Sequence, residues 1–448
     1  MSQTGSKLID PQVSFIVTYA PAGLGHLRVA DALIEGLPKG VTPLLLGAED
    51  KSITLLHRAS SAKLLGRPAI EWLQFGFQEQ LFTLVYRSYL RAAAGYLQKL
   101  LTDFLHRHAV RPRTVVVVCT HFALAHQLGA IKDELSAREN VRIILVVQVT
   151  DDSPQPVWYV IGANLIIVPS DTTRSKLISY GRQWHLPPIP IEVAPYPISL
   201  QLLRSLTKAE QARRRGQFSP AKTPVITTAV PISGAAVGLP FLAGFIESLH
   251  HRSPRFSFHI MAKVAPQTAA FLAQMSRCPN VTNHTADHDR GVVASYVDLY
   301  QSEVFGFEVT KPSEQAFKAL ATPKQRGGAI LLFADPVGEQ EHNNLGFLSR
   351  HNLIPDADDQ AALWQYAAAG KSLGGDEKPL WLARARHWRG LRLPPKSDMA
   401  AGFVDWCLTQ GVFVAMGDYM FHPENDLHRH ELATSGVTVF WEKVSQWL

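Results

Sequence analysis

The sequence predicts an α/β protein with two doubly wound domains, and three observations support this. Apolar, strand-like runs alternate with helical segments from residue 13 to about residue 200, and a second series of such runs starts at residue 225. Each series opens with a glycine-rich turn between a strand and a helix. An acidic, amide-rich segment follows the last strand of the second series, at residues 335–344. Parallel sheets covered by helices on both faces produce this alternation.

Composition narrows the class of protein. The chain has 448 residues, 46% of them hydrophobic, which is enough for two cores. Its formal charge of +6 favours anionic ligands or an anionic membrane surface. Lys and Arg are not interleaved with aromatic residues in a strip, so nucleic acid is not an expected partner. Three widely spaced cysteines, no secretory pattern and no apolar stretch of about 20 residues indicate a cytoplasmic protein.

The first series of strand candidates is short and rich in β-branched residues, as expected of parallel strands buried on both faces. The candidates are residues 13–19, 42–46, 114–119, 142–149, 165–168 and 191–194. Helical segments separate most of these strands. We therefore expect an N-terminal Rossmann-like domain over residues 1–204.

The second series predicts another Rossmann-like domain, over residues 223–355. Its strand candidates are residues 225–230, 256–261, 303–309 and 329–333. The polar, basic stretch 205–222 has the composition of an interdomain linker. Residues 356–448 are mostly helical in pattern and are predicted to form a helical C-terminal extension. The polar run 283–289 is expected to be a surface loop.

The first glycine-rich turn contains Gly23 and Gly25 and ends at His26. Glycine lets backbone N–H groups approach an anion closely, and a helix that starts there directs the positive end of its dipole to the same place. Such a turn suits a diphosphate. The same turn is also an ordinary way to pack a helix tightly on a sheet, so both interpretations stay open.

The second glycine-rich turn contains Ser233, Gly234 and Gly238. Its backbone amides and the following helix could neutralise a diphosphate without a bound metal, so we expect neither a metal nor a cofactor. Lys311, just after another strand, could add a cation near the phosphates. A lysine in that position is also often only a solvated side chain.

The amide-rich segment contributes Gln340, Glu341 and Asn343, whose side chains can donate to and accept from the vicinal hydroxyls of a sugar. The alternative is a helix N-terminus matched by acidic residues after a glycine. Ser313 and Glu314 are expected to contact a phosphate or a ribose, the serine through its hydroxyl group.

His26 is the candidate base, because imidazole titrates near neutral pH. The alternative is a histidine that only caps or packs beside the turn. Asp151, at the end of its strand, could orient His26 or share its role, and Thr120 and His121 are further candidates at a similar sheet edge.

Two other segments could serve a function, one as a lipid-binding surface and one as a metal site. Residues 66–108 are predicted to form aromatic-rich amphipathic helices, which suit core packing or an anionic lipid interface. His428 and His430 are two residues apart and would diverge on a helix, so no metal site is expected there.

Four segments together resemble a known family. They are Gly23-Leu24-Gly25-His26 with Leu27, Arg28 and Ala30; Val149-Thr150-Asp151 with Trp158 and Ile167-Val168-Pro169-Ser170; Thr310-Lys311-Pro312 with Ala319-Leu320; and Asp335-Pro336 with Gly338, Gln340, Glu341 and Asn343. In order and over residues 14–352, they are similar to segments of the monogalactosyldiacylglycerol synthases, which are UDP-sugar-dependent glycosyltransferases of the GT-B class.

The resemblance implies two Rossmann-like domains facing a central cleft. It also implies transfer of a sugar from a nucleotide-sugar, UDP-linked, to a hydroxyl of a lipid or small-molecule acceptor, with the nucleotide-sugar as co-substrate. An acceptor of this kind is consistent with a cytoplasmic protein attached peripherally to a membrane through residues 66–108. The chain departs from the family at Ser313-Glu314, where a glycine pair is usual, and lacks a histidine between Asp151 and Trp158. A nucleotide-sugar epimerase or hydrolase, and an inactive GT-B-like binding protein, are therefore the alternatives.

Overall fold

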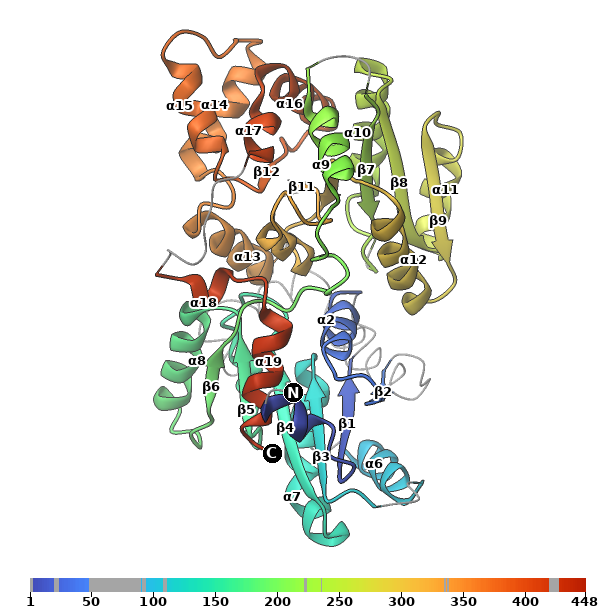
Figure 1. The fold of residues 1–448 in the computed structure, drawn as a ribbon, viewed down its shortest axis with the longest axis vertical. Helices are drawn as coiled ribbons and strands as arrows, with labels where there is room; N and C mark the ends of the chain where they lie inside the picture. Colours follow the sequence, from blue (N-terminus) through green and yellow to red (C-terminus); the bar gives the residue numbers. More distant parts are fainter. Residues whose placement is uncertain are drawn as a thin grey trace. The chain divides into compact units, whose positions relative to one another are not determined.

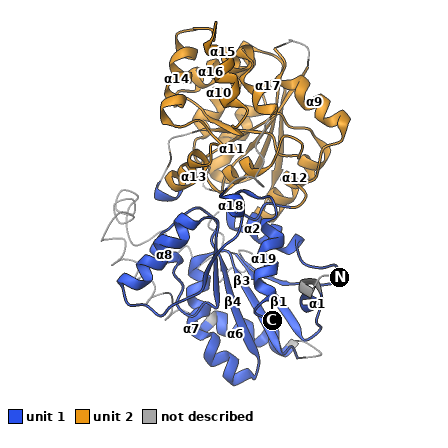
Figure 2. Ribbon diagram, turned by 60° about the vertical axis from the view of Figure 1, so that its left-hand side comes forward, with its two compact units in different colours: residues 1–199, 338–340, 427–448 blue, residues 200–337, 341–426 orange. Residues whose placement is uncertain are grey.

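The chain divides into two compact units, which are described one at a time (Figures 1 and 2). A computed structural model describes residues 3–19, 24–47, 90, 94–107, 111–220, 224–234, 236–333, 336, 338–418 and 427–448. Unit 1 comprises Met1–Ser199, Gly338–Gln340 and Leu427–Leu448, and unit 2 comprises Leu200–Val337 and Glu341–Asp426.

Unit 1 is built on a six-stranded parallel sheet in the order β2-β1-β3-β4-β5-β6. The strands are β1 (Val13–Thr18), β2 (Leu44–Leu46), β3 (Thr114–Cys119), β4 (Arg142–Gln148), β5 (Leu165–Val168) and β6 (Ile191–Val193). Each of them falls within a predicted run. Every residue of β5 is buried, as expected of an inner parallel strand covered on both faces.

The helices of unit 1 come from both ends of the chain. They are α1 (Gln3–Leu8), α2 (Leu24–Glu35), α6 (Gly95–Arg107), α7 (Phe122–Glu139), η1 (Pro156–Trp158, a 3-10 helix), α8 (Asp171–Gln183), α18 (Arg429–Leu432) and α19 (Gly436–Ser445). The indole Nε1 of Trp441 on α19 donates to the Leu33 carbonyl oxygen at 2.8 Å, and its ring packs edge-on against Phe15. The last helix of the chain is therefore part of the unit 1 core.

Only part of the amphipathic segment 66–108 is described, namely residue 90 and residues 94–107. Within α6, Leu97, Leu101 and Leu105 are buried and spaced four residues apart, so they form one apolar face in the core of unit 1. Lys99 is exposed. The remainder of the predicted membrane segment lies outside the described residues. Among those that are described, no helix is long and apolar enough to cross a membrane.

Unit 2 contains a second six-stranded parallel sheet, in the order β12-β11-β10-β7-β8-β9. The strands are β7 (Ile226–Pro231), β8 (Phe256–Lys263), β9 (Val281–Ala286), β10 (Phe307–Thr310), β11 (Ala329–Leu332) and β12 (Gly390–Arg392). Together the two sheets confirm the predicted fold class, α/β with two Rossmann-like doubly wound domains. The predicted cleft stays a prediction.

Two strands of unit 2 correct the sequence analysis. The loop predicted at 283–289 was wrong, because residues 283–286 belong to β9 at the edge of the sheet. An edge strand that is partly exposed along its length carries polar residues, and so lacks the apolar run that reveals an inner strand. The three-residue strand β12 lies within the segment 356–448 that was predicted to be helical.

Ten helices of unit 2 are described over the residues given above, and two of them are short. They are α9 (Lys208–Phe218), α10 (Leu239–Arg252), α11 (Pro266–Met275), α12 (Asp289–Ser302), η2 (Glu314–Leu320, a 3-10 helix), α13 (Gly338–Arg350), α14 (Ala357–Ala368), α15 (Glu377–Ala385), α16 (Ser397–Gln410) and α17 (Val412–Gly417). The first three residues of α13 are counted with unit 1.

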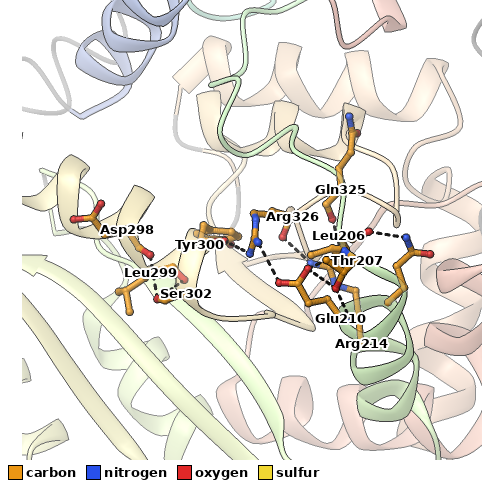
Figure 3. Close-up of polar contacts among 11 residues, drawn as sticks. Leu206, Thr207, Glu210, Arg214, Asp298, Leu299, Tyr300, Ser302, Gln325 and Arg326 are labelled. Atoms are coloured by element: carbon orange, nitrogen blue, oxygen red, sulfur yellow. Dashed lines mark hydrogen bonds and ion pairs between the residues drawn. The ribbon is translucent and has the colours of Figure 1, made fainter.

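The segment 205–222, predicted as a linker, contains the packed helix α9 (Figure 3). Thr207 and Glu210 form a capping box at its start. Arg214 is only 3% exposed, and its guanidinium donates to four backbone carbonyls, those of Pro323, Gln325, Arg326 and Gly327. Arg326 in turn donates to Glu210 at 3.1 Å. One arginine of the basic cluster therefore fastens this helix to the loop before β11.

Candidate functional site

Each sheet has one position where the strand order reverses. In unit 1 the chain passes from β1 to β2 on one side of β1, and later returns to β3 on the other side. In unit 2 the corresponding strands are β7, with β8 on one side and β10 on the other. The loops that leave such neighbouring strands diverge, and open α/β sheets bind ligands there, beyond the carboxyl ends of the strands. Both predicted glycine-rich turns directly follow these strands.

The turn of unit 2 runs from β7 into α10. Gly238 has φ +78° at the N-cap, a conformation that favours glycine, and a Cβ there would lie 2.5 Å from Cε2 of Phe333. No side chain caps α10. Pro240 in the first turn has no N–H, and the other N–H groups at this helix start have no side-chain cap, which leaves them available to an anion.

Three of the predicted donor-binding residues line one pocket in unit 2. Ser233 comes from the turn after β7, and Lys311 and Ser313 come from the loop after β10. Thr310, Gln315 and Phe333 complete the polar and aromatic part of its wall. The pocket has a volume of about 10 Å³, which is roughly the space for one water molecule or one phosphate oxygen.

A buried ion pair holds the loop after β10 in place. Glu308 on β10 is fully buried, and its carboxylate accepts from Lys318 on η2 and from Tyr296 and Tyr300 on α12. Because η2 begins directly after Ser313, this network ties both ends of the loop that carries Lys311 and Ser313. A buried carboxylate needs such partners, since an unpaired charge in the core is strongly destabilising.

Lys311 also forms an ion pair. Its Nζ lies 2.5 Å from Oε1 of Glu341, whose side chain is 8% exposed. The loop is held further by Asn344, whose Nδ2 donates to the Pro312 carbonyl oxygen at 3.2 Å. The buried Nδ2 of Asn343 has no hydrogen-bond partner among the described residues. The structure thus brings the predicted cation and a predicted sugar-binding carboxylate into direct contact.

The other predicted residues are more scattered. Gly234 is exposed in the turn after β7, and the half-buried Glu314 is the first residue of η2. Gln340 donates through Nε2 to Oε1 of Gln155 at 3.0 Å, both residues being counted with unit 1. Gln340 and Glu341 are therefore adjacent in sequence but contact different partners.

In unit 1, His26 lies in the first turn of α2, at the position where the strand order reverses. Its Nδ1 is 2.7 Å from the Thr120 carbonyl oxygen and 3.2 Å from Oγ1 of Thr150. A carbonyl oxygen can only accept, so Nδ1 carries the proton and the lone pair of the neutral ring is on Nε2. The hydroxyl of Thr120 donates to the His26 carbonyl oxygen at 3.0 Å. This arrangement fixes both the ring and its tautomer. Gly25 is the preceding residue in α2, and Gly23 lies outside the described residues.

The acidic residue predicted to orient His26 is Asp151. Asp151 follows Thr150 at the end of β4 and is half-buried. The next residue, Asp152, is buried, and its carboxylate accepts from Ser170 and Thr173 at the start of α8. Thr150, rather than Asp151, supplies the side chain that contacts Nδ1.

Sequence reasoning missed Thr150, Thr310 and Gln315. Thr150 lies just beyond β4, Thr310 is the last residue of β10, and Gln315 lies in η2, so the first two are polar residues at the carboxyl end of an apolar strand. That position was the available signal, and it was used for Thr120 and His121. His121 instead packs its ring edge-on against His26, with centroids 4.8 Å apart, and accepts from the Ala123 amide as the N-cap of α7.

Comparisons with known proteins give similarity at the level of structure. The sequence matches no protein-family model, and no curated protein matches it significantly. Three similar solved structures are UDP-GlcNAc 2-epimerase from Neisseria meningitidis bound to UDP-GlcNAc (10% identity, 97% of this chain and 99% of that chain covered, TM-score 0.44), a UDP-glucosyltransferase from Polygonum tinctorium (12%, 97% and 98%, 0.46) and MurG from Acinetobacter baumannii (10%, 97% and 100%, 0.45). At these identities and TM-scores, the function of the chain has to be argued from its own residues.

Proposed function

We propose that the protein is a glycosyltransferase that moves a sugar from a nucleotide-sugar, UDP-linked, to a hydroxyl of a lipid or small-molecule acceptor. The observation that carries this proposal is the pocket of unit 2, where Ser233, Lys311 and Ser313 meet beside the start of α10. Two hydroxyls, one ammonium group and the uncapped helix start form a donor-rich, positively charged environment for an anion.

A diphosphate fits this environment better than a neutral ligand does. One phosphate oxygen would enter the pocket, whose volume is about 10 Å³. The rest of the diphosphate would lie over the turn that contains Gly234 and Gly238. Glu341 accounts for the sugar, because a carboxylate that already accepts from Lys311 keeps further lone pairs for a hydroxyl.

His26 has the chemistry of the acceptor base. In this proposal its Nε2 takes the proton of the acceptor hydroxyl as that oxygen bonds to the anomeric carbon. The bond from the anomeric carbon to the diphosphate oxygen breaks, and its electron pair leaves with the diphosphate. The Thr120 carbonyl would stabilise the imidazolium ion by accepting from Nδ1.

A second candidate is a protein that binds a nucleotide-sugar without turnover. The Lys311–Glu341 ion pair favours it, because it neutralises the cation nearest to the predicted phosphate site. In a transferase, the ligand would have to compete with Glu341 for Lys311.

Ligand binding is tested first, and turnover is tested afterwards. Thermal unfolding would be measured with UDP, UDP-sugars and other nucleotide-sugars, because a ligand that binds only the folded state raises Tm. We expect UDP and one or more UDP-sugars to raise it. Lys311→Met and Ser233→Ala should abolish the shift, whereas Lys324→Met, at an exposed lysine of unit 2 outside the pocket, should retain it.

Turnover would then be followed by NMR with the donor that binds best. A new glycoside with a hydroxyl acceptor supports the transferase. An altered sugar without acceptor indicates an epimerase, a free sugar indicates a hydrolase, and binding without any product indicates the inactive relative. If no nucleotide-sugar changes Tm, the donor site proposed here is wrong.

A further inference from the structure

A second cluster of chemically active side chains lies in unit 1, where α18 meets the start of α8. Nε2 of His430 is 2.6 Å from Oδ2 of Asp171 and 3.9 Å from Oε1 of Glu431. The three atoms all lie within 4.8 Å of one another. The proposed transfer reaction uses none of these residues.

These three atoms are of the types that bind zinc. Zn²⁺ takes imidazole nitrogen and carboxylate oxygen at about 2.0–2.2 Å, in a tetrahedron whose ligand atoms are therefore about 3.3 Å apart. The separations of 2.6 and 3.9 Å lie on either side of that value. Shifts of less than about 1 Å would bring them to it. Nδ1 of His428 is 4.0 Å from Oε1 of Glu431, which makes it a candidate for the fourth ligand.

The surroundings fix one ligand and leave the others accessible. The Glu431 side chain is 3% exposed, and its Oε1 accepts from the Asp171 backbone amide at 3.0 Å. The side chains of Asp171 and His430 are 46% and 44% exposed, so an ion could enter from solvent. Arg174 donates to Oδ1 of Asp171 at 3.3 Å. It engages the carboxylate oxygen that faces away from His430 and orients the other one.

We propose that Asp171, His430 and Glu431 bind one divalent transition-metal ion of the Zn²⁺ type. The ion replaces the proton between His430 and Asp171 and fastens residues 427–432 to the first turn of α8. The sequence indicated no metal site here because it considered only His428 and His430. The other two ligands of His430's cluster are Glu431 and Asp171, the latter 259 residues away from His430.

The simpler explanation is that these residues form a hydrogen-bonded clamp and bind no ion. A zinc titration distinguishes this explanation from a metal site. The full chain, first stripped of metal with a chelator, would be titrated with ZnCl₂ by calorimetry. Its Tm would be measured with and without the ion. We expect one Zn²⁺ per chain and a higher Tm with the ion.

Two variants locate the ion. Asp171→Asn keeps the shape and an oxygen that can accept from His430, and His430→Gln keeps a donor toward Asp171, so each preserves a hydrogen-bonded clamp. Both should lower zinc affinity by more than about 100-fold, beyond what loss of an outer-shell partner costs. His251→Ala, at an exposed histidine of unit 2, should bind as the parent does.

The titration of the parent protein is sufficient to overturn the proposal. If the parent shows no one-to-one zinc binding, the cluster is only a hydrogen-bonded clamp. The site is equally overturned if either variant retains the parent's affinity or if His251→Ala loses it.

Discussion

The two units share a topology but differ in the chemistry at the point where the strand order reverses. In unit 1 that position holds a histidine, whose ring is fixed by the Thr120 carbonyl and by Thr150. In unit 2 it holds Ser233, Lys311 and Ser313 around a small pocket beside an uncapped helix. Both are glycine turns between a first strand and its helix.

The difference shows that the turn itself does not determine chemistry. A glycine-rich turn follows the first strand in both units, but the side chains beside it differ, and the proposed function assigns a proton to the edge in unit 1 and an anion to the edge in unit 2. The residues that matter come after β3 and β4 in unit 1 and after β10 in unit 2. Four predictions test this division of roles.

The largest effect is expected at His26. If unit 1 supplies the base, His26→Asn should lower kcat by about 10²–10⁴-fold, the range typical of a general base. Donor binding should be unchanged, because the proposed function assigns the donor to unit 2. Steady-state kinetics and nucleotide calorimetry on the same samples measure both.

The same substitution at His106, whose side chain is 59% exposed on α6, is the matched control and should leave kcat unchanged. A His26→Asn enzyme with the parent's kcat would remove the proton-handling role from unit 1.

The second prediction concerns the ion pair of unit 2. Lys311→Met should lower the free energy of unfolding by about 3 kcal/mol, because it removes the cation that is paired with the buried Glu341 carboxylate. The double variant with Glu341→Gln should recover most of that loss. Urea unfolding of the two single variants and the double variant gives the coupling free energy.

The single variant Glu341→Gln tests the role of Lys311 directly, because it removes the carboxylate that would compete with a bound anion for Lys311. It should tighten UDP binding if Lys311 serves an anion. Weaker or equal UDP binding would show that the pair is only structural.

A smaller effect is expected at the turn of unit 2. Gly238→Ala places a Cβ 2.5 Å from the Phe333 ring and has to adopt φ +78°. The free energy of unfolding should fall by about 1–2 kcal/mol. Phe333 also lines the pocket, so UDP affinity should fall with it. Gly346→Ala on α13, where a Cβ meets nothing within 4 Å, is the matched control and should not destabilise the protein.

The smallest effect concerns pH. Burial, followed by the charge of neighbouring His284, lowers the pKa of His259, although Glu303 opposes this, and burial lowers the pKa of His284. Below a pH of about 6.5 the unfolded chain therefore binds more protons at these sites than the folded chain does, and stability falls as pH falls.

His284→Gln should flatten this dependence. Urea unfolding at pH 7 and pH 5, for parent and variant, is the measurement. A parent whose stability does not fall between these values would contradict the assignment.

The sequence predicted those parts of the fold that depend on local pattern. The run Val115–Val118 could only be an inner strand, and β3 covers it. The strand β9 escaped prediction because its polar residues reflect its place at an edge, which tertiary structure decides. His26 was found because a glycine turn precedes it. Its contact with Thr150, 124 residues away, and the pairing of Lys311 with Glu341 depend on the folded chain.

The return of α19 to unit 1 sets the order in which the protein can fold during synthesis. The indole of Trp441 donates to the Leu33 carbonyl across 408 residues, so the ribosome has to deliver residue 441 before that contact can form. All residues assigned to unit 2 are made before residue 427. The later-starting unit can therefore finish first, while the N-terminal one waits with the Phe15 side of its core uncovered.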